Sequence, residues 1–268
     1  MRKKKNLKKK SNTKIAILFV AFVILIVAIS LISKFVLIVR QSQFDDQKRF
    51  TLTVSNTENI EVISFSPIGR SISRLKLSEN LDSKTLGKFL AIPIDGFILG
   101  NFLEIDQKAD SLLLKMILNY SKLETNLTIV DILKLFAFAK RLPESGVYER
   151  LISQDLSTSD IDSIVGRLVN DELIEKDRKT IQIINTTSVA GLGNRLARLI
   201  TNMGGDVILV ATEDSTQKSS TISYIDNKNY TVEKLSKILN FKTINVPSKG
   251  IADITIVIGE DSLNFLSF

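Results

Sequence analysis

The chain has no cysteine and no histidine, and it also has no tryptophan. Without cysteine there are no disulfide bonds and no thiolate nucleophile. Zinc sites of the Cys/His type and serine–histidine triads are excluded as well. Polysaccharide-binding surfaces generally expose tryptophan or tyrosine, so the lack of tryptophan makes such a surface less expected. A folded domain must be held by its apolar core alone, which is feasible in a chain of 268 residues.

Charge, proline and glycine are absent from residues 15–32, IAILFVAFVILIVAISLI, where Ser30 is the only polar side chain. As a helix this stretch spans about 27 Å, close to the roughly 30 Å hydrocarbon core of a bilayer. The run FVLIV extends it to Val39. Because unpaired backbone groups are costly in lipid, the pattern predicts a transmembrane helix from Ile15 to about Val39. The alternative is a buried helix of a soluble protein, but such helices seldom have so many apolar residues in a row.

Positive charge is concentrated before this stretch, since Met1 to Lys14 holds eight lysine and arginine residues and no acid. Such a cluster beside a membrane span stays in the cytoplasm, so we expect a cytoplasmic N-terminus and an extracytoplasmic body. A cleaved signal peptide has the same basic start, but its apolar region is shorter. The sequence therefore predicts an uncleaved, single-pass anchor in the cell membrane.

The charge of the remaining chain does not indicate a nucleic-acid surface. The formal net charge is +7, and the eight tail charges account for all of it, which leaves about −1 for the rest. Nucleic-acid binding by the tail is a rival explanation of the lysines. Because membrane topology already accounts for them, we expect no nucleic-acid partner.

The chain divides by pattern into five parts. These are a basic tail (1–14), the transmembrane helix (15–39), a polar stalk (40–49), an α+β region (50–175) and a C-terminal α/β domain (176–268). In the α+β region, alternating residues predict strands at Phe50–Ser55 and Ile60–Phe65. The sequence Thr128-Ile-Val-Asp131 has the form of a capping box and precedes an apolar helical run.

The C-terminal part has the order βαβ-β-α-β. The expected strands are Thr180–Ile184, Asp206–Ala211, Ser220–Ile225 and Ile254–Ile258, and the expected helices are Val189–Met203 and one that Thr231 caps. Short apolar runs in the strands favour a sheet packed on helices. The fold class is thus α/β (α+β overall), with a C-terminal sheet of about four strands packed by two helices.

The C-terminal part resembles the C-terminal domain of the LytR/CpsA/Psr envelope proteins. The residues that carry the resemblance are the strand IQIIN, the turn Asn185-Thr-Thr-Ser-Val-Ala-Gly-Leu-Gly, the segment NRLARLITNMGGDVILV, and later TISYIDNKNYTVEKLSKILN and IADITIVIGED. The match covers about a third of the chain. The resemblance implies a bacterial envelope location and an α/β fold.

The same family has a catalytic domain that moves polymers from a lipid pyrophosphate onto the cell wall, using an arginine cluster and acidic magnesium ligands. Residues 50–150 are faintly similar to it at LGKFLAIPIDGFILG. This region lacks a Pro-Arg-Asp motif, and Arg70 and Arg74 are its only arginines between Arg49 and Arg141. The middle region is therefore interpreted as, at most, a degenerate and truncated relative of that domain.

The residues that could contact a ligand lie between a strand and a helix in the C-terminal part. A helix N-terminus there could hold an anion such as a phosphate or carboxylate of wall polymer. The candidate residues are Asn185, Ser188, Gly191, Gly193 and Arg195. A dinucleotide fingerprint is not favoured, because its third glycine would fall at Leu196. We expect no cofactor, and the aspartates of the middle region are too dispersed for a metal site.

Two functional hypotheses follow. The first is a membrane-anchored binding or interaction module in cell-wall or envelope biogenesis, whose partner is an envelope polymer or protein and which has no catalytic residues. The alternative is a diverged phosphotransferase that attaches lipid-pyrophosphate-linked polymers to the wall. It requires Arg70, Arg74 and Asp95 to converge on one pocket.

Overall fold

The computed structural model describes residues 13–77, 83–153, 155–248 and 250–264. The described residues fall into two compact units that divide after Ser42. In the first unit, helix α1 runs from Thr13 to Gln41. Its part Ala16–Gln41 has a mean hydropathy of 3.1 and is long and apolar enough to cross a membrane. This helix is compatible with a single-pass membrane anchor.

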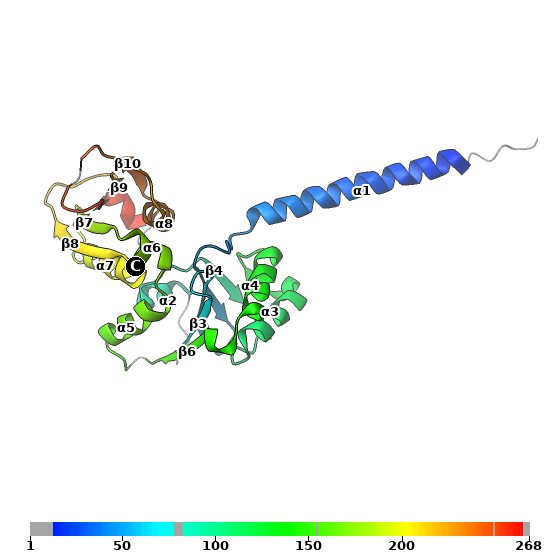
Figure 1. Ribbon diagram of the computed structural model, residues 1–268, viewed down its shortest axis with the longest axis horizontal. Coiled ribbons are helices and arrows are strands. Elements are labelled where there is room, and N and C mark those ends of the chain that lie inside the picture. The colour runs from blue at the N-terminus through cyan, green and yellow to red at the C-terminus, as the bar shows by residue number, and fades with distance from the viewer. Residues whose placement is uncertain (1–12, 78–82, 154, 249, 265–268) are drawn as a thin grey trace, which may run out of the picture. The chain divides into compact units, whose positions relative to one another are not determined.

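The second unit begins with a six-stranded sheet in the order β5-β4-β1-β2-β3-β6 (Figure 1). Its strands are β1 (Phe50–Ser55), β2 (Ile60–Ser66), β3 (Ser71–Leu77), β4 (Gly96–Leu99), β5 (Glu124–Thr125) and β6 (Val147–Ile152). The first three form an antiparallel meander in which Phe50 pairs with Phe65. Strands β4 and β6 add in parallel to β1 and β3. The predicted pair of strands at Phe50 and Ile60 is confirmed.

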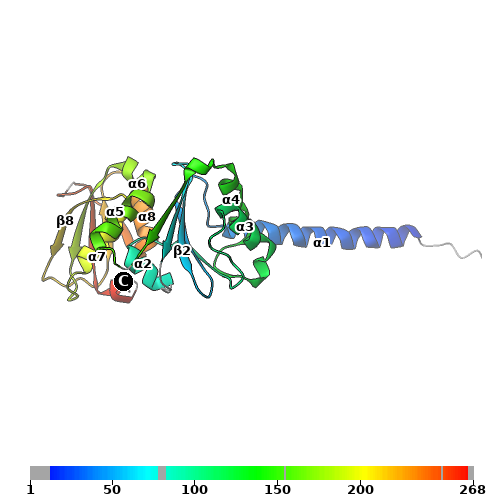
Figure 2. The same cartoon turned by 90° about the horizontal axis from the view of Figure 1, so that it is seen from below.

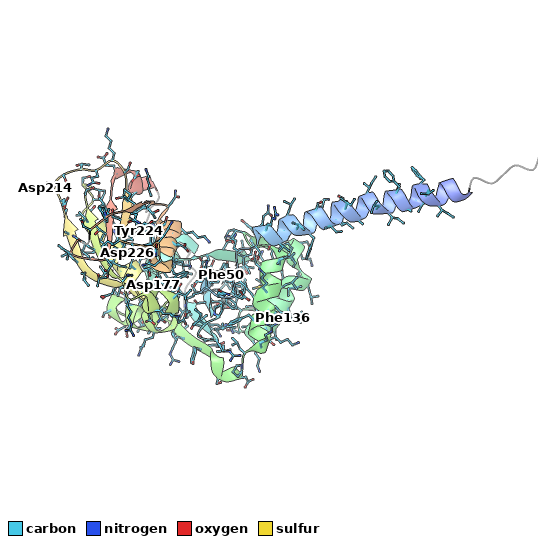
Figure 3. The ribbon with its side chains drawn as sticks, turned by 45° about the horizontal axis from the view of Figure 1, so that its top comes forward. Phe50, Phe136, Asp177, Asp214, Tyr224 and Asp226 are labelled. Carbon is cyan, nitrogen blue, oxygen red and sulfur yellow. The ribbon has the colours of Figure 1, made fainter. Side chains whose placement is uncertain are left out.

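Helices cover both faces of this sheet. On one face α3 (Ala109–Leu118) and α4 (Ile129–Arg141) pack on a core that includes Phe50, and Figure 3 labels Phe50 there and Phe136 on α4. On the other face α2 (Ser83–Leu90) and α5 (Thr158–Leu168) close a second core. Short 3-10 helices η1 (Tyr120–Lys122) and η2 (Glu144–Gly146) adjoin α3 and α4.

The predicted capping box at the start of α4 is confirmed. The Thr128 hydroxyl accepts from the Asp131 amide, and the Asp131 carboxylate accepts from the Thr128 amide. The structure differs from the predicted stalk of residues 40–49 from Gln43 onward. Phe44 and Arg49 are buried, and the amides of Gln43 and Phe44 both donate to Asp131. These residues belong to the folded body because Phe44 fills the α3–α4 core.

A second sheet has five strands in the order β10-β9-β11-β7-β8. They are β7 (Thr180–Asn185), β8 (Asp206–Thr212), β9 (Thr221–Tyr224), β10 (Lys242–Asn245) and β11 (Ile254–Ile258). The fifth strand, β10, lies at the edge, and its polar, four-residue sequence KTIN gave no strand signal. Helices α7 (Leu192–Asn202) and α8 (Tyr230–Leu239) share one core with β7, β9 and β11. The remaining helices are α6 (Glu172–Asp177) and the 3-10 helix η3 (Glu260–Asn264).

Two helix starts differ from the predictions. Asn229, not Thr231, caps α8 by accepting from the Val232 amide, and Thr231 is buried and donates instead to Asp177, which Figure 3 labels. Helix α7 begins at Leu192 rather than Val189. The Val189 amide donates to the Thr187 hydroxyl and its carbonyl accepts from the Asn185 side chain, so Val189 is held in the turn and the helix begins after Gly191.

The two sheets meet through helices, with α2, α5 and α7 between them in Figure 2. Arg198 of α7 pairs with Asp162 of α5 at 2.8 Å and donates to the Phe89 carbonyl. Asn202 is buried and donates to the Leu90 carbonyl and to Asp162. These bonds satisfy polar groups that burial would otherwise leave unpaired.

Candidate binding site

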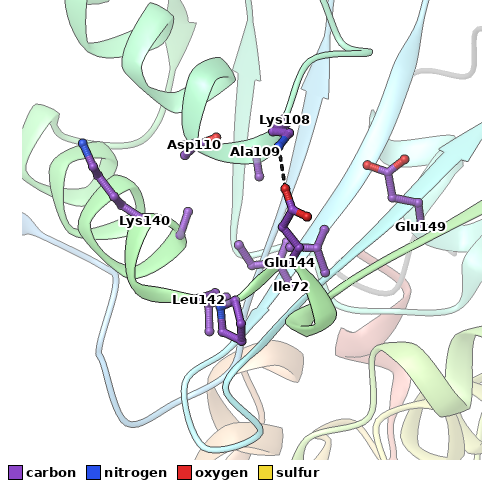
Figure 4. Close-up of a pocket in the computed structure, with 11 residues that line it drawn as sticks. Ile72, Lys108, Ala109, Asp110, Lys140, Leu142, Glu144 and Glu149 are labelled. Carbon is purple, nitrogen blue, oxygen red and sulfur yellow. Dashed lines mark hydrogen bonds and ion pairs between the residues drawn. The ribbon is translucent and has the colours of Figure 1, made fainter.

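A cavity of about 380 Å³ opens at the edge of the first sheet, where the start of α3 meets the end of α4 (Figure 4). Its lining is Ile72, Lys108, Ala109, Asp110, Ala139, Lys140, Leu142, Pro143, Glu144, Val147 and Glu149. The apolar members come from β3, α3, α4, the turn after α4 and β6. The charged members stand around them, so the cavity offers an apolar floor and a charged rim. That combination suits binding of a small or extended amphiphilic ligand.

The rim carries paired charges rather than a reactive group. Lys108 Nζ lies 2.7 Å from Glu144 Oε1, and both side chains are exposed. The hydrogen bond and the opposite charge raise the pKa of Lys108 and lower the pKa of Glu144. Both shifts hold the groups in their charged forms at neutral pH. A general acid or base needs a pKa moved toward neutrality, so this pair is not arranged for proton transfer.

Beside the cavity lies a buried ion pair. Arg74 and Glu61 are 1% and 0% exposed, and their closest atoms are 2.9 Å apart. The Arg74 guanidinium also reaches Glu149 of the cavity wall at 2.7 Å and donates to the carbonyls of Ile105 and Gln107. Burial raises the pKa of Glu61 from 4.5 to about 7, while the Arg74 charge and hydrogen bonds act in the opposite direction.

All five N–H groups of Arg74 are thereby used inside the chain. Nε donates to Glu61, Nη1 to Gln107 and Glu149, and Nη2 to Glu61 and Ile105. A guanidinium has five donors and no more. None is left to grip a phosphate unless a present bond breaks. Arg74 therefore stabilises the fold rather than presenting a substrate-binding group.

The structure does not bring Arg74 together with the other two residues of the transferase alternative. Arg70 lies in the exposed turn between β2 and β3, where its backbone has a positive φ of 48°. Asp95 accepts from the Thr51 amide and pairs with Lys234 of α8 at 3.3 Å. Within the part of the chain that the structure describes, no cluster of three or more acidic side chains is placed to hold a metal ion. The geometry gives no pyrophosphate grip at these residues.

The predicted ligand residues near α7 have two different roles. Asn185 is buried, and its side chain makes three bonds. Oδ1 accepts from the Thr187 amide and hydroxyl, and Nδ2 donates to the Val189 carbonyl. Gly193 lies against β8, since a Cβ there would come within 2.9 Å of a Val210 methyl carbon. Asn185 therefore holds the turn after β7, and Gly193 allows α7 to pack closely on β8. Gly191 begins the helix with a φ of +76°, and Ser188, Gly191 and Arg195 are exposed.

A polar seam between the two sheets was not predicted from the sequence. Arg49 donates to Ser64 and to Glu172, which lies 123 residues away. Tyr230 donates to Asp171, and burial raises the pKa of both groups. Next to the seam is a cavity of about 150 Å³ lined by Lys48, Lys234 and Lys237 among others. The stalk-like composition of residues 40–49 concealed Arg49, because only the tertiary structure supplies its partners.

Residues 178–261 match the family described as LytR cell envelope-related transcriptional attenuator. The chain carries a LytR C-terminal domain. The match covers β7 through β11 of the second sheet, so the predicted resemblance is confirmed on those residues. A LytR C-terminal domain supports a role related to the cell envelope.

Solved structures add little to this match. The transcriptional regulator yvhJ from Bacillus subtilis is 13% identical, with a TM-score of 0.32 over 40% of this chain and 83% of that one. Lmo1026 from Listeria monocytogenes is 11% identical, with a TM-score of 0.32 over 47% and 97%. TagV from B. subtilis is 14% identical, with a TM-score of 0.19 over 73% and 99%. No curated protein sequence matches the chain.

Proposed function

We propose that this protein is a single-pass membrane protein of the cell envelope that acts by binding rather than by catalysis. Its basic N-terminal tail lies in the cytoplasm, and the body from residue 43 lies on the other side of the membrane. The observation that carries the proposal is the LytR C-terminal domain on the same chain as a membrane-length apolar helix. The lysines before that helix support the orientation.

Binding is favoured over transfer chemistry by the state of the charged side chains. Arg74 has every donor engaged, and Lys108 and Glu144 neutralise each other on the cavity rim. A phosphotransferase needs positive groups that are free to meet a pyrophosphate. The cavity instead has an apolar floor, which suits a ligand that is bound without being chemically changed.

For the LytR C-terminal domain we propose an anionic envelope polymer as ligand, held at the start of α7. Asn185 holds the turn and Gly193 packs against β8, so we assign direct contact with the ligand to Ser188, the Gly191 backbone and Arg195. A helix N-terminus and an arginine both favour a phosphate or carboxylate group.

The test is co-sedimentation of the full chain, held in lipid nanodiscs, with purified cell-wall material that carries its anionic polymer. We expect specific binding that weakens with added salt and with Arg195→Gln. The matched control is Arg150→Gln, an exposed arginine on β6 of the first sheet. Binding no greater than that of empty nanodiscs would refute the proposal. An equal loss of binding in Arg195→Gln and Arg150→Gln would show that the start of α7 is not the binding site.

A further inference from the structure

The first two residues of the folded body are fixed to the start of α4. The amides of Gln43 and Phe44 donate to Asp131 Oδ1 at 2.7 and 2.9 Å, and the Gln43 side chain donates to the Asn126 carbonyl at 3.0 Å. The Phe44 ring is buried, and its carbonyl accepts from Lys134. The chain therefore leaves the body at one defined point, the first turn of α4.

The end of α3 lies at this same point. The Tyr120 hydroxyl, just past α3, donates to the Leu127 carbonyl, just before α4, at 2.9 Å. At the other ends of these helices, Lys108 and Leu142 line one cavity (Figure 4). The two helices therefore run antiparallel, and the end of α3 and the start of α4 form one corner of the body.

This corner exposes large apolar side chains. Leu118, the last residue of α3, is 74% exposed, and Leu114, one turn before it, is 43% exposed. Leu133, about one turn after the start of α4, is 45% exposed. Ile129 and Val130 are half-buried beside them, and Lys122 is exposed in η1. Apolar residues next to lysine are typical of a surface that enters the interface of a bilayer.

The length of the connection decides what this corner meets. Helix α1 ends at Gln41, and only Ser42 lies between it and Gln43. Two steps of the chain span at most about 7 Å. The headgroup layer on each side of a bilayer is itself about 5–8 Å deep. When α1 spans a bilayer, the covalent connection therefore keeps the start of α4 within reach of the lipid headgroups, whatever the orientation of the body.

From this we infer that the corner defined by Leu114, Leu118, Lys122, Val130 and Leu133 docks on the bilayer in which α1 is anchored. The inference rests on the proposed membrane anchoring. The leucines enter the boundary between headgroups and acyl chains, and Lys122 lies level with the lipid phosphates. Docking restricts the tilt of the body and fixes which of its faces point away from the membrane.

The lack of native cysteine allows a direct test by single-cysteine labelling of the full chain. Leu118→Cys carries an environment-sensitive fluorophore in vesicles of phosphatidylcholine with some phosphatidylglycerol. The vesicles also contain lipids with a nitroxide near the top of the acyl chain. We expect the fluorescence to shift to the blue and to lose most of its intensity to the nitroxide. The matched control is Leu151→Cys, which is 64% exposed on the edge strand β6 of the first sheet. A fluorophore at this position should keep its intensity.

A third position separates docking from anchoring. A fluorophore on Ser30→Cys lies inside the apolar helix, and nitroxides placed deeper in the lipid acyl chains should quench it. Quenching at Ser30 without quenching at Leu118 overturns docking and leaves the anchor standing. No quenching at either position overturns both.

Two further results decide the nature of the contact. A blue shift at Leu118 without nitroxide quenching means that protein covers the corner, which also overturns the inference. In the Leu118→Cys chain, adding Leu114→Asn and Leu133→Asn should restore most of the intensity. Because all three leucines are exposed, these changes should leave the fold intact.

Discussion

The two sheets of the body differ in what they bury. Among the described residues, the buried ionisable side chains all precede the LytR C-terminal match: Glu61, Arg74 and Asp131 lie in the first sheet and its helices, and Arg49 and Asp171 lie in the polar seam between the sheets. In the described part of the LytR C-terminal domain, the buried polar side chains are uncharged, namely Asn185, Thr186, Thr187, Asn202, Ser220 and Thr231. A buried charge costs much free energy unless it is paired and hydrogen-bonded, whereas a buried neutral polar group needs only hydrogen-bond partners. The first sheet should therefore be the more sensitive to single substitutions and to pH.

The largest expected effect is at Arg74. Arg74→Met leaves the Glu61 carboxylate buried without its partner, and we expect a loss of about 3–5 kcal/mol in the free energy of unfolding. Urea denaturation in a mild detergent measures this loss. The control adds Glu61→Leu to Arg74→Met, which removes both charges and should recover most of the stability. A single variant as stable as the parent would show that the pair does not act as the geometry indicates.

The next effect is a pH dependence from Glu61. Its pKa is raised in the fold to about 7 from 4.5. The folded state therefore holds this proton more tightly, so the contribution is complete below about pH 4.5 and is lost as the pH rises through 7. We expect the free energy of unfolding to fall by on the order of 2–3 kcal/mol over that window, relative to Glu61→Gln. Parallel stability curves for the parent and Glu61→Gln would contradict this assignment.

The smallest effect is in the LytR C-terminal domain. Asn185→Ala removes the acceptor for the Thr187 amide and hydroxyl, and we expect a loss of about 1–2 kcal/mol without new pH dependence. Exposed Asn194, in the first turn of α7, is the control, and Asn194→Ala should change stability little. A larger loss at Asn185 than at Arg74 would reverse the comparison between the two sheets.

The sequence predicted the second sheet better than the first. In the second sheet, short apolar strands alternate with amphipathic helices, and each signal is local. Even so, β10 was missed, because an edge strand needs little apolar sequence. In the first sheet, β2 alternates apolar and polar residues, which is typical of a strand with one solvent-exposed face. All seven of its residues are nevertheless buried, because helices cover both faces of the sheet.

The same contrast applies to the individual sites. The capping bonds between Thr128 and Asp131 follow from a spacing of three residues. The bonds from Gln43 and Phe44 to the same carboxylate join residues almost ninety positions apart, so only the packed structure shows them. The sequence predicts Asn185 at the start of the turn before α7, whereas in the structure it is the last residue of β7, and its side chain binds that turn. Nothing in the local sequence says whether a turn amide faces inward or outward.

The proposed function depends most on the side of the membrane on which the body lies. Lys228→Cys places a single, exposed thiol in the LytR C-terminal domain of a chain that otherwise has none. A membrane-impermeant maleimide applied to intact cells should label it, while Lys5→Cys in the basic tail should react only after the cells are made permeable. The reverse pattern, with the tail labelled in intact cells and the body protected, would contradict the proposed topology and the envelope partners inferred from it.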